Sequence, residues 1–333
     1  MSIPRTFRRR TLALGALMLP VSGLAACADP VPSATGPGTS DAGGGASDGD
    51  GAEGAAIDTS GTQELIRASA DPEVAALLPP EIAQAGVLRA GTSGAGTAPL
   101  AFLADDNETY IGSEIDIARI VADRLGLELD LRLTTWENWP LKLEAGEFDV
   151  VHANIGINAE RLEKFDFASY RAAYMSFLAK KGADFFLEDP DSVSGRIIAV
   201  GAATNQERIL TDWNALLTEQ GKEPAQLKNY SSDADTLLAL GSGRIDATMG
   251  PYASQSFVAA RRTDVEVQGR IDAGWPDQTL VAATFPAGSG LAAAYAAALN
   301  SLIADGTYAK VQERWGLSAE SLPASRVHTK ENP

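Results

Sequence analysis

Cysteine and histidine are almost absent from this chain of 333 residues, which has one cysteine, Cys27, and two histidines, His152 and His328. A single cysteine excludes a disulfide within the chain, so the fold must be stabilised by burial of the hydrophobic side chains that form 45% of the sequence. We interpret His152 as a core residue in a strand and His328 as part of a polar tail. Neither has a companion at the spacing of a metal site or a catalytic triad, so we expect no metal and no cofactor.

Positive charge is also scarce, with 27 Lys and Arg against 44 Asp and Glu, a formal net charge of −17. This balance argues against nucleic acid as a partner and against a mainly electrostatic hold on anionic lipids. The apolar run 11–26 is too short to span a bilayer comfortably and is interrupted by Pro20. We therefore interpret it as part of an export signal.

The end of that signal is its most informative part. Four arginines precede the apolar run, and Leu24-Ala25-Ala26-Cys27 closes it with the small-residue pattern at which bacterial lipoproteins are cut and lipidated. The sequence thus predicts a signal peptide over 1–27, a lipid on Cys27 and a location on the extracytoplasmic face of the cell membrane. Sec and twin-arginine export both remain open. Residues 28–64, rich in Gly, Ala, Ser and Asp, predict a disordered tether.

Beyond the tether, hydrophobic periodicity predicts alternating strands and helices. Residues 86–91 are typical of a buried strand, 115–125 place apolar side chains at helical spacing, and 127–133 alternate leucine with charged residues. Strand, helix and strand in this order indicate a parallel sheet with helices on its faces. A further strand, which repeats the opening one, is expected at 195–200 and is followed by a helix at 204–217.

An internal repeat indicates two lobes. Residues 143–149, Leu-Glu-Ala-Gly-Glu-Phe-Asp, are matched by residues 240–246, Leu-Gly-Ser-Gly-Arg-Ile-Asp. Each copy is a helix end, a glycine stop and an acid before a strand. We expect one such unit in each lobe.

Residues 153–161 and 165–170 resemble the ligand loop of family 3 extracellular solute-binding proteins, the polar amino-acid receptors of ABC importers. Further matches lie at 112–116, 146–149, 203–207, 243–247 and 305–308, so the resemblance covers 78–316. It implies an α/β fold of the periplasmic-binding-protein type II kind, with two lobes joined by a two-segment hinge. The expected parts are lobe 1 at 65–177 and 278–333 and lobe 2 at 178–277, with crossing segments at 175–180 and 278–285.

Two features of the ligand site also have chemical support from the residues themselves. Arg161 offers a planar fork that can hold a carboxylate bidentately, and the amides at Thr204 and Asn205 open a helix whose N-terminus favours an anion. The alternatives are a surface pair of Arg161 with Glu160 or Glu163, and a plain N-cap at Thr204. In both places the two interpretations are compatible with the sequence.

The resemblance implies further ligand-binding positions. Trp139 matches a site where a side chain packs on the ligand, although core packing is an alternative, and Trp136 is expected in the core. Glu114 is either a compensating charge or an ordinary acid at a helix start. The complete predicted set is Ser93, Glu114, Trp139, Asn154, Gly156, Arg161, Thr204, Asn205, Gly250 and Tyr252.

Two departures from the family pattern concern the ligand's ammonium group. Gly250-Pro251-Tyr252 stands where the family usually has an acid that receives it, and residues 94–96 replace the usual aromatic residue after the first strand. An α-amino acid is therefore left open as the ligand.

The resulting expectation is a lipid-anchored receptor, not an enzyme, which binds a small carboxylate-bearing solute such as an amino acid or a derivative and delivers it to ABC permease subunits. One alternative is a dehydratase-like enzyme, since this fold also hosts such activity, but no positioned general acid or base is evident. Another is a sensor that does not transport. The glycine-rich stretch 91–96 lacks the lysine of a phosphate loop.

Overall fold

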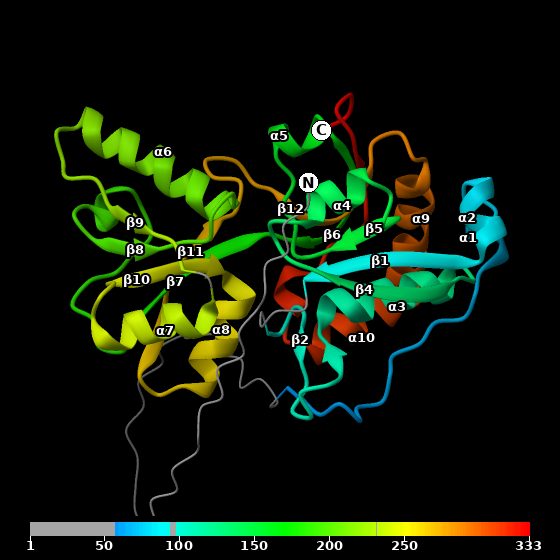
Figure 1. Ribbon diagram of the computed structural model, residues 1–333, viewed down its shortest axis with the longest axis horizontal. Coiled ribbons are helices and arrows are strands. Elements are labelled where there is room, and N and C mark those ends of the chain that lie inside the picture. Colours follow the sequence, from blue (N-terminus) through cyan, green and yellow to red (C-terminus); the bar gives the residue numbers. More distant parts are fainter. Residues whose placement is uncertain (1–56, 94–97, 231) are drawn as a thin grey trace, which may run out of the picture. The chain divides into compact units, whose positions relative to one another are not determined.

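Two large β-sheets with helices packed against them, and one small two-stranded sheet, form the described part of this computed structural model (Figure 1). The structure describes residues 57–93, 98–230 and 232–333, all within one compact unit. The predicted signal peptide, Cys27, residues 28–56 of the predicted tether and residues 94–96 lie outside this range.

The first lobe is built on a six-stranded sheet of order β13-β6-β12-β5-β1-β4. Strand β1 pairs in parallel with β4 and β5, whereas β12 is antiparallel to β5 and β6. The strands of this sheet are β1 (Val87–Ser93), β4 (Glu128–Thr134), β5 (Val150–His152), β6 (Phe165–Ala172), β12 (Leu280–Pro286) and β13 (Val327–His328). His328 therefore ends a short edge strand, which corrects the expectation of a polar tail.

The second lobe is built on a five-stranded sheet of order β11-β7-β10-β8-β9. Strand β8 is parallel to both of its neighbours, β9 and β10. Strand β7 is antiparallel to its neighbours β10 and β11. The strands are β7 (Tyr174–Lys180), β8 (Ile197–Ala199), β9 (Gln226–Lys228), β10 (Ala247–Pro251) and β11 (Val265–Asp272).

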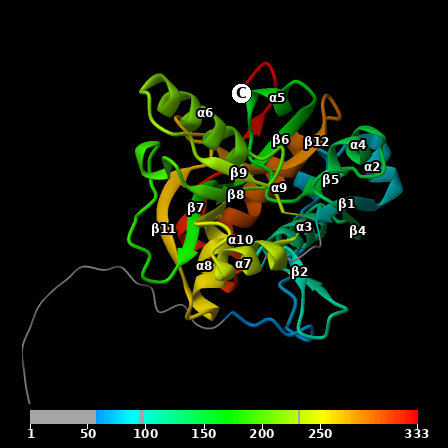
Figure 2. The same cartoon turned by 60° about the vertical axis from the view of Figure 1, so that its left-hand side comes forward.

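Helices cover the sheets as the periodicity predicts. In the first lobe α3 packs on β1, β4, α9 and α10, while α4 packs on β1, β5 and β12. In the second lobe α7 and α8 lie on one side of the sheet and α6 on the other (Figures 1 and 2). The helices are α1 (Pro72–Ala75), α2 (Pro80–Ala85), α3 (Ser113–Arg124), α4 (Trp139–Glu144), α5 (Ala159–Leu162), α6 (Asn205–Glu219), α7 (Asp233–Ser242), α8 (Tyr252–Arg261), α9 (Leu291–Ala304) and α10 (Thr307–Arg314), with 3-10 turns η1 (Asp191–Val193) and η2 (Ser318–Glu320).

The sequence repeat forms the same unit in both lobes. Helix α4 ends before Gly146, whose φ is 72°, and α7 ends before Gly243, whose φ is 74°; both angles lie in the left-handed region that favours glycine. Asp149 then accepts a hydrogen bond from the amide of Arg89 in β1 at 2.8 Å, and Asp246 accepts one from the amide of Ile197 in β8 at 2.7 Å. Each acid ties the new strand to the first parallel strand of its own lobe.

The chain passes between the sheets slightly earlier than the sequence suggested. It crosses at Ala173, between β6 and β7, and again between β11 and β12. The expected crossing segment 175–180 lies inside β7, and most of 278–285 lies inside β12, because their hydrogen bonds complete the two sheets. The lobe boundaries at 177 and 277 stay predictions.

The last residues of the predicted tether are part of the folded structure. Residues 57–64, which we call the strap, contact the first lobe: the amide of Asp105 donates to the carbonyl of Thr59 at 3.0 Å, and Ile57 packs against core side chains. Asp105 lies between two short paired strands, β2 (Phe102–Leu103) and β3 (Tyr110–Ile111). Within the described residues, no helix has the length and apolar character needed to cross a membrane.

Candidate ligand-binding site

A cleft of about 570 Å³ opens between the lobes. Its walls follow the carboxyl ends of β1, β4 and β5 in the first lobe and of β8, β9 and β10 in the second. Parallel strands bring their carboxyl ends to one edge of a sheet, and this edge is where open α/β folds bind ligands. Two such edges face each other here.

Most of the predicted ligand-binding residues line this cleft. Trp139 and Tyr252 are the exceptions. The residues that do line it are Ser93, Glu114, Asn154, Gly156, Arg161, Thr204, Asn205 and Gly250. The topology therefore brings together residues that are up to about half the chain apart in sequence.

The two tryptophans have the opposite places from those expected. Trp139 has an exposed fraction of 2% and packs in the core, with its ring centroid 5.2 Å from that of Phe165. Trp136 instead lines the cleft, and the guanidinium carbon of Arg161 lies 5.2 Å from its ring centroid. Trp139 is the first residue of α4 and points into the lobe, whereas Trp136 lies in the loop before it. Trp136, and not Trp139, is thus the tryptophan available to a ligand.

Tyr252 begins α8 beside the cleft, not in it. The guanidinium carbon of Arg270 lies 5.7 Å from the Tyr252 ring centroid and 4.2 Å from that of Tyr174. These contacts place Tyr252 near the crossover between β6 and β7. Tyr252 is not among the residues that line the cleft.

Arg161 reaches from the first lobe to the second. The side chain of Asn158 caps α5 by accepting a hydrogen bond from the amide of Arg161 at 2.8 Å. The Arg161 guanidinium donates to the carbonyl of Gly156 at 2.7 Å and, across the cleft, to that of Ala203 at 3.4 Å. No salt bridge joins it to a carboxylate among the described residues, and Glu163 pairs with Lys330 instead.

Burial without a paired carboxylate has an electrostatic consequence for Arg161. Burial lowers its pKa to about 10, although neighbouring Glu160 acts in the opposite direction. The guanidinium is still protonated at neutral pH. It is therefore a cation at the wall of a cleft, held by two carbonyl oxygens and available to an anion.

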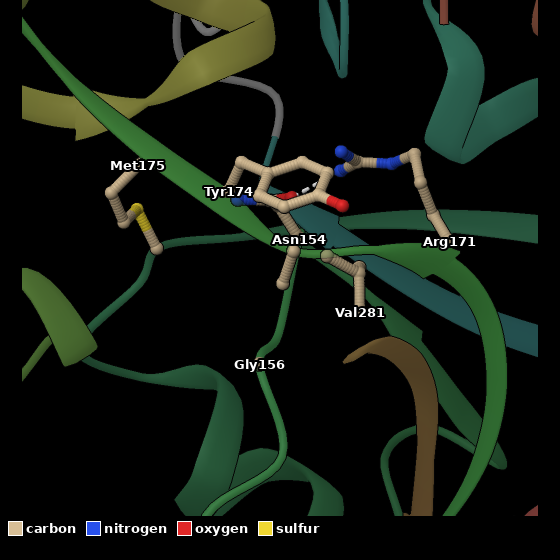
Figure 3. Close-up of a pocket in the computed structure, with 7 residues that line it drawn as sticks. Asn154, Gly156, Arg171, Tyr174, Met175 and Val281 are labelled. Atoms are coloured by element: carbon tan, nitrogen blue, oxygen red, sulfur yellow. Dashed lines mark hydrogen bonds between the residues drawn. The ribbon is translucent and has the colours of Figure 1, made fainter. Parts of the chain in front are cut away.

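A buried ionic network supports the loop that follows β5. Arg171 donates to the side-chain oxygen of Asn154 (Figure 3). It also donates to a carboxylate oxygen of Glu320, and its Nη2 lies 3.7 Å from Glu114. Glu114 in turn accepts hydrogen bonds from the amide of Asn154 at 3.0 Å and from the hydroxyl of Tyr170. Asn154 has a φ of 52°, an uncommon angle for a residue other than glycine, and is held from both its amide and its side chain.

Charge and burial together fix the protonation of this network. Burial tends to lower the pKa of Arg171, but Glu320 and Glu114 outweigh it and raise the pKa. Burial, with Glu114 nearby, raises the pKa of Tyr170 well above its ordinary value, so this phenol stays a donor. Beside Arg171 and Asn154 lies a void of about 10 Å³, which is room for about one water molecule.

The second lobe contributes a helix start and small residues. Thr204 caps α6, with its side chain accepting from the amide of Glu207 at 3.2 Å. Asn205 accepts from the side chain of Asn158 at 3.0 Å, a direct bond between the lobes. At Gly156 a Cβ would lie 2.6 Å from Nδ2 of Asn205, so glycine is what permits this approach.

Several cleft residues were not anticipated from the sequence. Glu137 follows β4, Tyr230 and Asp233 follow β9, and Gln255 lies in α8 after β10. The signal that could have found them is their position after strand ends. Desolvation raises the pKa of Asp233, which forms no salt bridge with any described residue.

The histidines take no part in this cleft. His152 is fully buried and its Nε2 lies 2.6 Å from the hydroxyl of Tyr295, as expected for a core residue. Burial lowers its pKa to about 3. Over residues 57–93, 98–230 and 232–333, no group of three or more potential ligands could hold a metal ion.

Comparison with known proteins identifies the family. Residues 88–318 match the model of the bacterial extracellular solute-binding proteins, family 3, and the chain belongs to this family. It is therefore a solute-binding protein and not an enzyme, and the predicted α/β fold of the periplasmic-binding-protein type II kind is confirmed.

Three relatives illustrate the similarity. The arginine-binding protein ArgT of Corynebacterium glutamicum is 30% identical over 261 residues, which cover 77% of this chain and 83% of ArgT. The L-cystine-binding protein TcyA of Bacillus subtilis is 26% identical over 235 residues, 70% of this chain and 82% of TcyA. The crystal structure of the ancestral amino acid-binding protein AncCDT-1, a precursor of cyclohexadienyl dehydratase, matches with a TM-score of 0.60 and 26% identity over 71% of this chain and 97% of that one.

Proposed function

We propose that this protein is a lipid-anchored extracytoplasmic receptor that captures an amino acid or a closely related carboxylate in the cleft and delivers it to an ABC importer. The observation that carries the proposal is Arg161, a half-buried cation at the cleft wall that forms no salt bridge with any described residue. Its unpaired charge favours a ligand carboxylate, and its reach to Ala203 lets one ligand group be held where the lobes meet.

The opposite charge in the cleft is supplied by acids. Glu137 and Asp233 line the walls without a salt bridge among the described residues, and Glu114, 3.7 Å from Arg171, lines the cleft as well. A ligand with one carboxylate and at least one positive group complements this arrangement better than a dicarboxylate. Because Pro251 stands where the family usually has an acid, we propose that the ligand's positive charge is balanced by these carboxylates instead. ArgT and TcyA, named for arginine and cystine, support an amino acid as the ligand class.

Closure around the ligand is the proposed means of capture. Arg161 and Asn158 of the first lobe already bond to Ala203 and Asn205 of the second. A carboxylate bound at this junction would add contacts to both lobes and favour the closed form over the open one. Small-angle scattering should therefore show compaction at saturating ligand, and an unchanged radius of gyration would contradict this part of the proposal.

The ligand and the role of Arg161 are tested together. We would screen arginine, lysine, cystine, glutamate and neutral amino acids by thermal shift, since a ligand at 100 times its Kd adds about 2.7 kcal/mol of apparent stability. Calorimetry on the best ligand then compares wild type with Arg161→Ala. Loss of one partner of a buried charge pair costs roughly 2–5 kcal/mol, which is about 30-fold to several thousand-fold in affinity.

Arg132→Ala is the matched control, because this arginine pairs with Asp130 on the surface of the first lobe, outside the cleft wall. We expect its affinity to equal that of wild type. Near-wild-type binding by Arg161→Ala would refute the carboxylate clamp, whereas glutamate binding more tightly than arginine would refute the proposed balance of charges.

Attachment and delivery need separate tests. Cys27→Ser should remove the mature protein from the membrane fraction and abolish labelling by a palmitate analogue. Deletion of the cognate permease should abolish uptake of the identified solute. Uptake that persists without the permease would favour a sensor over a transport receptor.

A further inference from the structure

The lobes also touch at a place outside the ligand-binding cleft. Phe102 in β2 of the first lobe is 7% exposed, and its ring lies between two others. The ring centroid of Trp315, in the same lobe, is 5.8 Å away in an edge-on arrangement, and that of Phe257, in α8 of the second lobe, is 5.9 Å away. Phe257 therefore completes an aromatic cluster that belongs otherwise to the first lobe.

Arg261 extends this contact to the strap. Its guanidinium carbon lies 3.6 Å from the ring centroid of Phe257, one turn earlier in α8, and its Nη2 donates to the carbonyl of Ile57 at 3.1 Å. The strap itself is held on the first lobe, where Thr59 bonds to Asp105 through both its carbonyl and its hydroxyl. One arginine of the second lobe thus joins a ring of its own helix to the main chain of the strap.

The same two elements also form part of the cleft wall. Leu100 and Ala101, which directly precede Phe102, line the cleft, and so do Ser254 and Val258 of α8. Phe257 and Arg261 do not line it. The contact therefore borders the ligand site without belonging to it.

We propose that Phe257 and Arg261 form a clasp with Phe102 and the strap, which stabilises the closed arrangement of the lobes independently of the ligand. Phe102 and Ile57 belong to one lobe and Phe257 and Arg261 to the other, so these contacts are lost when the lobes separate. A contact present only in the closed form raises the fraction of closed molecules and hence the apparent affinity of any ligand that requires closure. Phe257 and Arg261 are then positioning residues that act through closure and not through the ligand.

The inference places a determinant of affinity where the strap meets the second lobe. The strap is the last part of the predicted tether. A pull or displacement of the strap would break the Arg261 bond to Ile57 and weaken closure. The clasp therefore offers a physical route by which the attachment of the chain could influence ligand release.

Phe257→Ala and Arg261→Met test the clasp, with Arg262→Met as the control. Arg262 is the next residue and carries the same charge, but it pairs with Asp264 of its own lobe at 2.7 Å. The aromatic pair of Phe102 and Phe257 stabilises the closed form, so Phe257→Ala should weaken ligand affinity about 2- to 10-fold. This loss should appear as a faster dissociation rate. Arg262→Met should bind as wild type does. Folded variants whose dissociation rates equal that of wild type would overturn the proposal.

A second measurement does not depend on the proposed function. In the full chain carrying Cys27→Ser, spin labels at Leu141→Cys and Leu216→Cys, both exposed and on different lobes, report the distance between the lobes without ligand. The clasp predicts that Phe257→Ala and Phe257→Leu each shift the distances toward longer values. If no amino acid binds wild type, the receptor proposal fails while this measurement still decides the clasp. Identical distance distributions in wild type and both variants would overturn it.

Discussion

The interiors of the two lobes differ in charge. Every buried Asp, Glu, Arg or His side chain among the described residues lies in the first lobe: Glu114, Asp116, Arg124, Asp149, His152, Arg171 and Glu320. The buried polar residues of the second lobe are neutral and include Asn205, Gln206, Thr248, Gln255 and Gln268. Both lobes repeat the same helix-to-strand unit, so the difference is not imposed by the fold.

The contrast indicates a division of labour in the cleft. Buried ion pairs add little net stability compared with apolar packing, but they are directional and strongly disfavour arrangements that leave a charge unpaired. In the first lobe they hold the loop of Asn154 in one conformation before any ligand arrives. The second lobe presents main-chain amides, neutral side chains and the carboxylate of Asp233 at the cleft wall, while its interior holds no buried charge. We infer that the first lobe orients the ligand and the second completes its enclosure.

Arg171→Met should give the largest effect and is the most direct test of this contrast. It leaves Glu114 and Glu320 buried without their cation, so the free energy of unfolding should fall by about 3–5 kcal/mol. Arg208→Met is the comparison in the second lobe, where the exposed pair with Asp212 contributes at most about 1 kcal/mol. Urea denaturation followed by circular dichroism measures both. Similar small losses in the two variants would remove the distinction between the lobes.

The sequence predicted the elements of this fold better than the network within it. The helix that contains Ile117 and Val121 and the strand that alternates leucine with charge were recognisable because their periodicity is local. Arg171 and Glu320 are 149 residues apart, and nothing in the local pattern of either residue signals that they meet. Long-range pairing of this kind depends on the register of β6 against the C-terminal segment.

The candidate site shows the same limit. Arg161, Thr204 and Asn205 line the cleft, where motif position and chemistry agreed in placing them, and their part in ligand binding stays a prediction. Trp136 and Trp139 are three residues apart, and only the start of α4 decides which ring turns inward. Asp233 was missed because β9 is three residues long and carries a weak strand signal.

Acidification should destabilise the first lobe through His152. Burial lowers the pKa of His152 from 6.5 to about 3, so between these values the unfolded chain binds the proton and the folded chain does not. The contribution of neutral His152 to the free energy of unfolding is therefore fully present above pH 6.5 and is lost as pH falls. At pH 5 this residue alone lowers the free energy of unfolding by about 2 kcal/mol. His152→Asn cannot titrate and should lose about 2 kcal/mol less than wild type between pH 7 and pH 5. Urea denaturation at pH 7 and pH 5 measures the loss for both proteins. If wild type and His152→Asn lose the same free energy of unfolding between these pH values, His152 is not the responsible group.

Gly156→Ala tests the junction of the lobes. Its Cβ would lie 2.6 Å from Nδ2 of Asn205, so Asn205 must move and give up its bond to Asn158 when the cleft closes. We expect affinity to weaken by about 1–3 kcal/mol, while unfolding of the first lobe is little changed because the clash lies between lobes. Asn205→Ala on the same background should recover part of the affinity by removing the clash. A double variant that binds no better than Gly156→Ala would mean that the glycine matters for another reason.

Thr204→Ala should have the smallest effect, and it separates the two interpretations of this residue. The Thr204 hydroxyl caps α6 by accepting from the amide of Glu207, and its loss should lower the free energy of unfolding by about 1 kcal/mol. The other amides of the first turn of α6 remain in place in Thr204→Ala. If a ligand anion binds these amides and not the Thr204 hydroxyl, ligand affinity should fall by less than about threefold, which is under 1 kcal/mol. Thr204→Ser keeps the cap and should match wild type in both measurements. Ser232→Ala removes the corresponding cap of α7, where the hydroxyl accepts from the amide of Asp235 at 3.1 Å, and provides the comparison for stability. A loss of affinity in Thr204→Ala much larger than its loss of stability would show that the hydroxyl itself binds the ligand, and the second lobe would then contribute a directional side-chain contact of the kind we assign to the first.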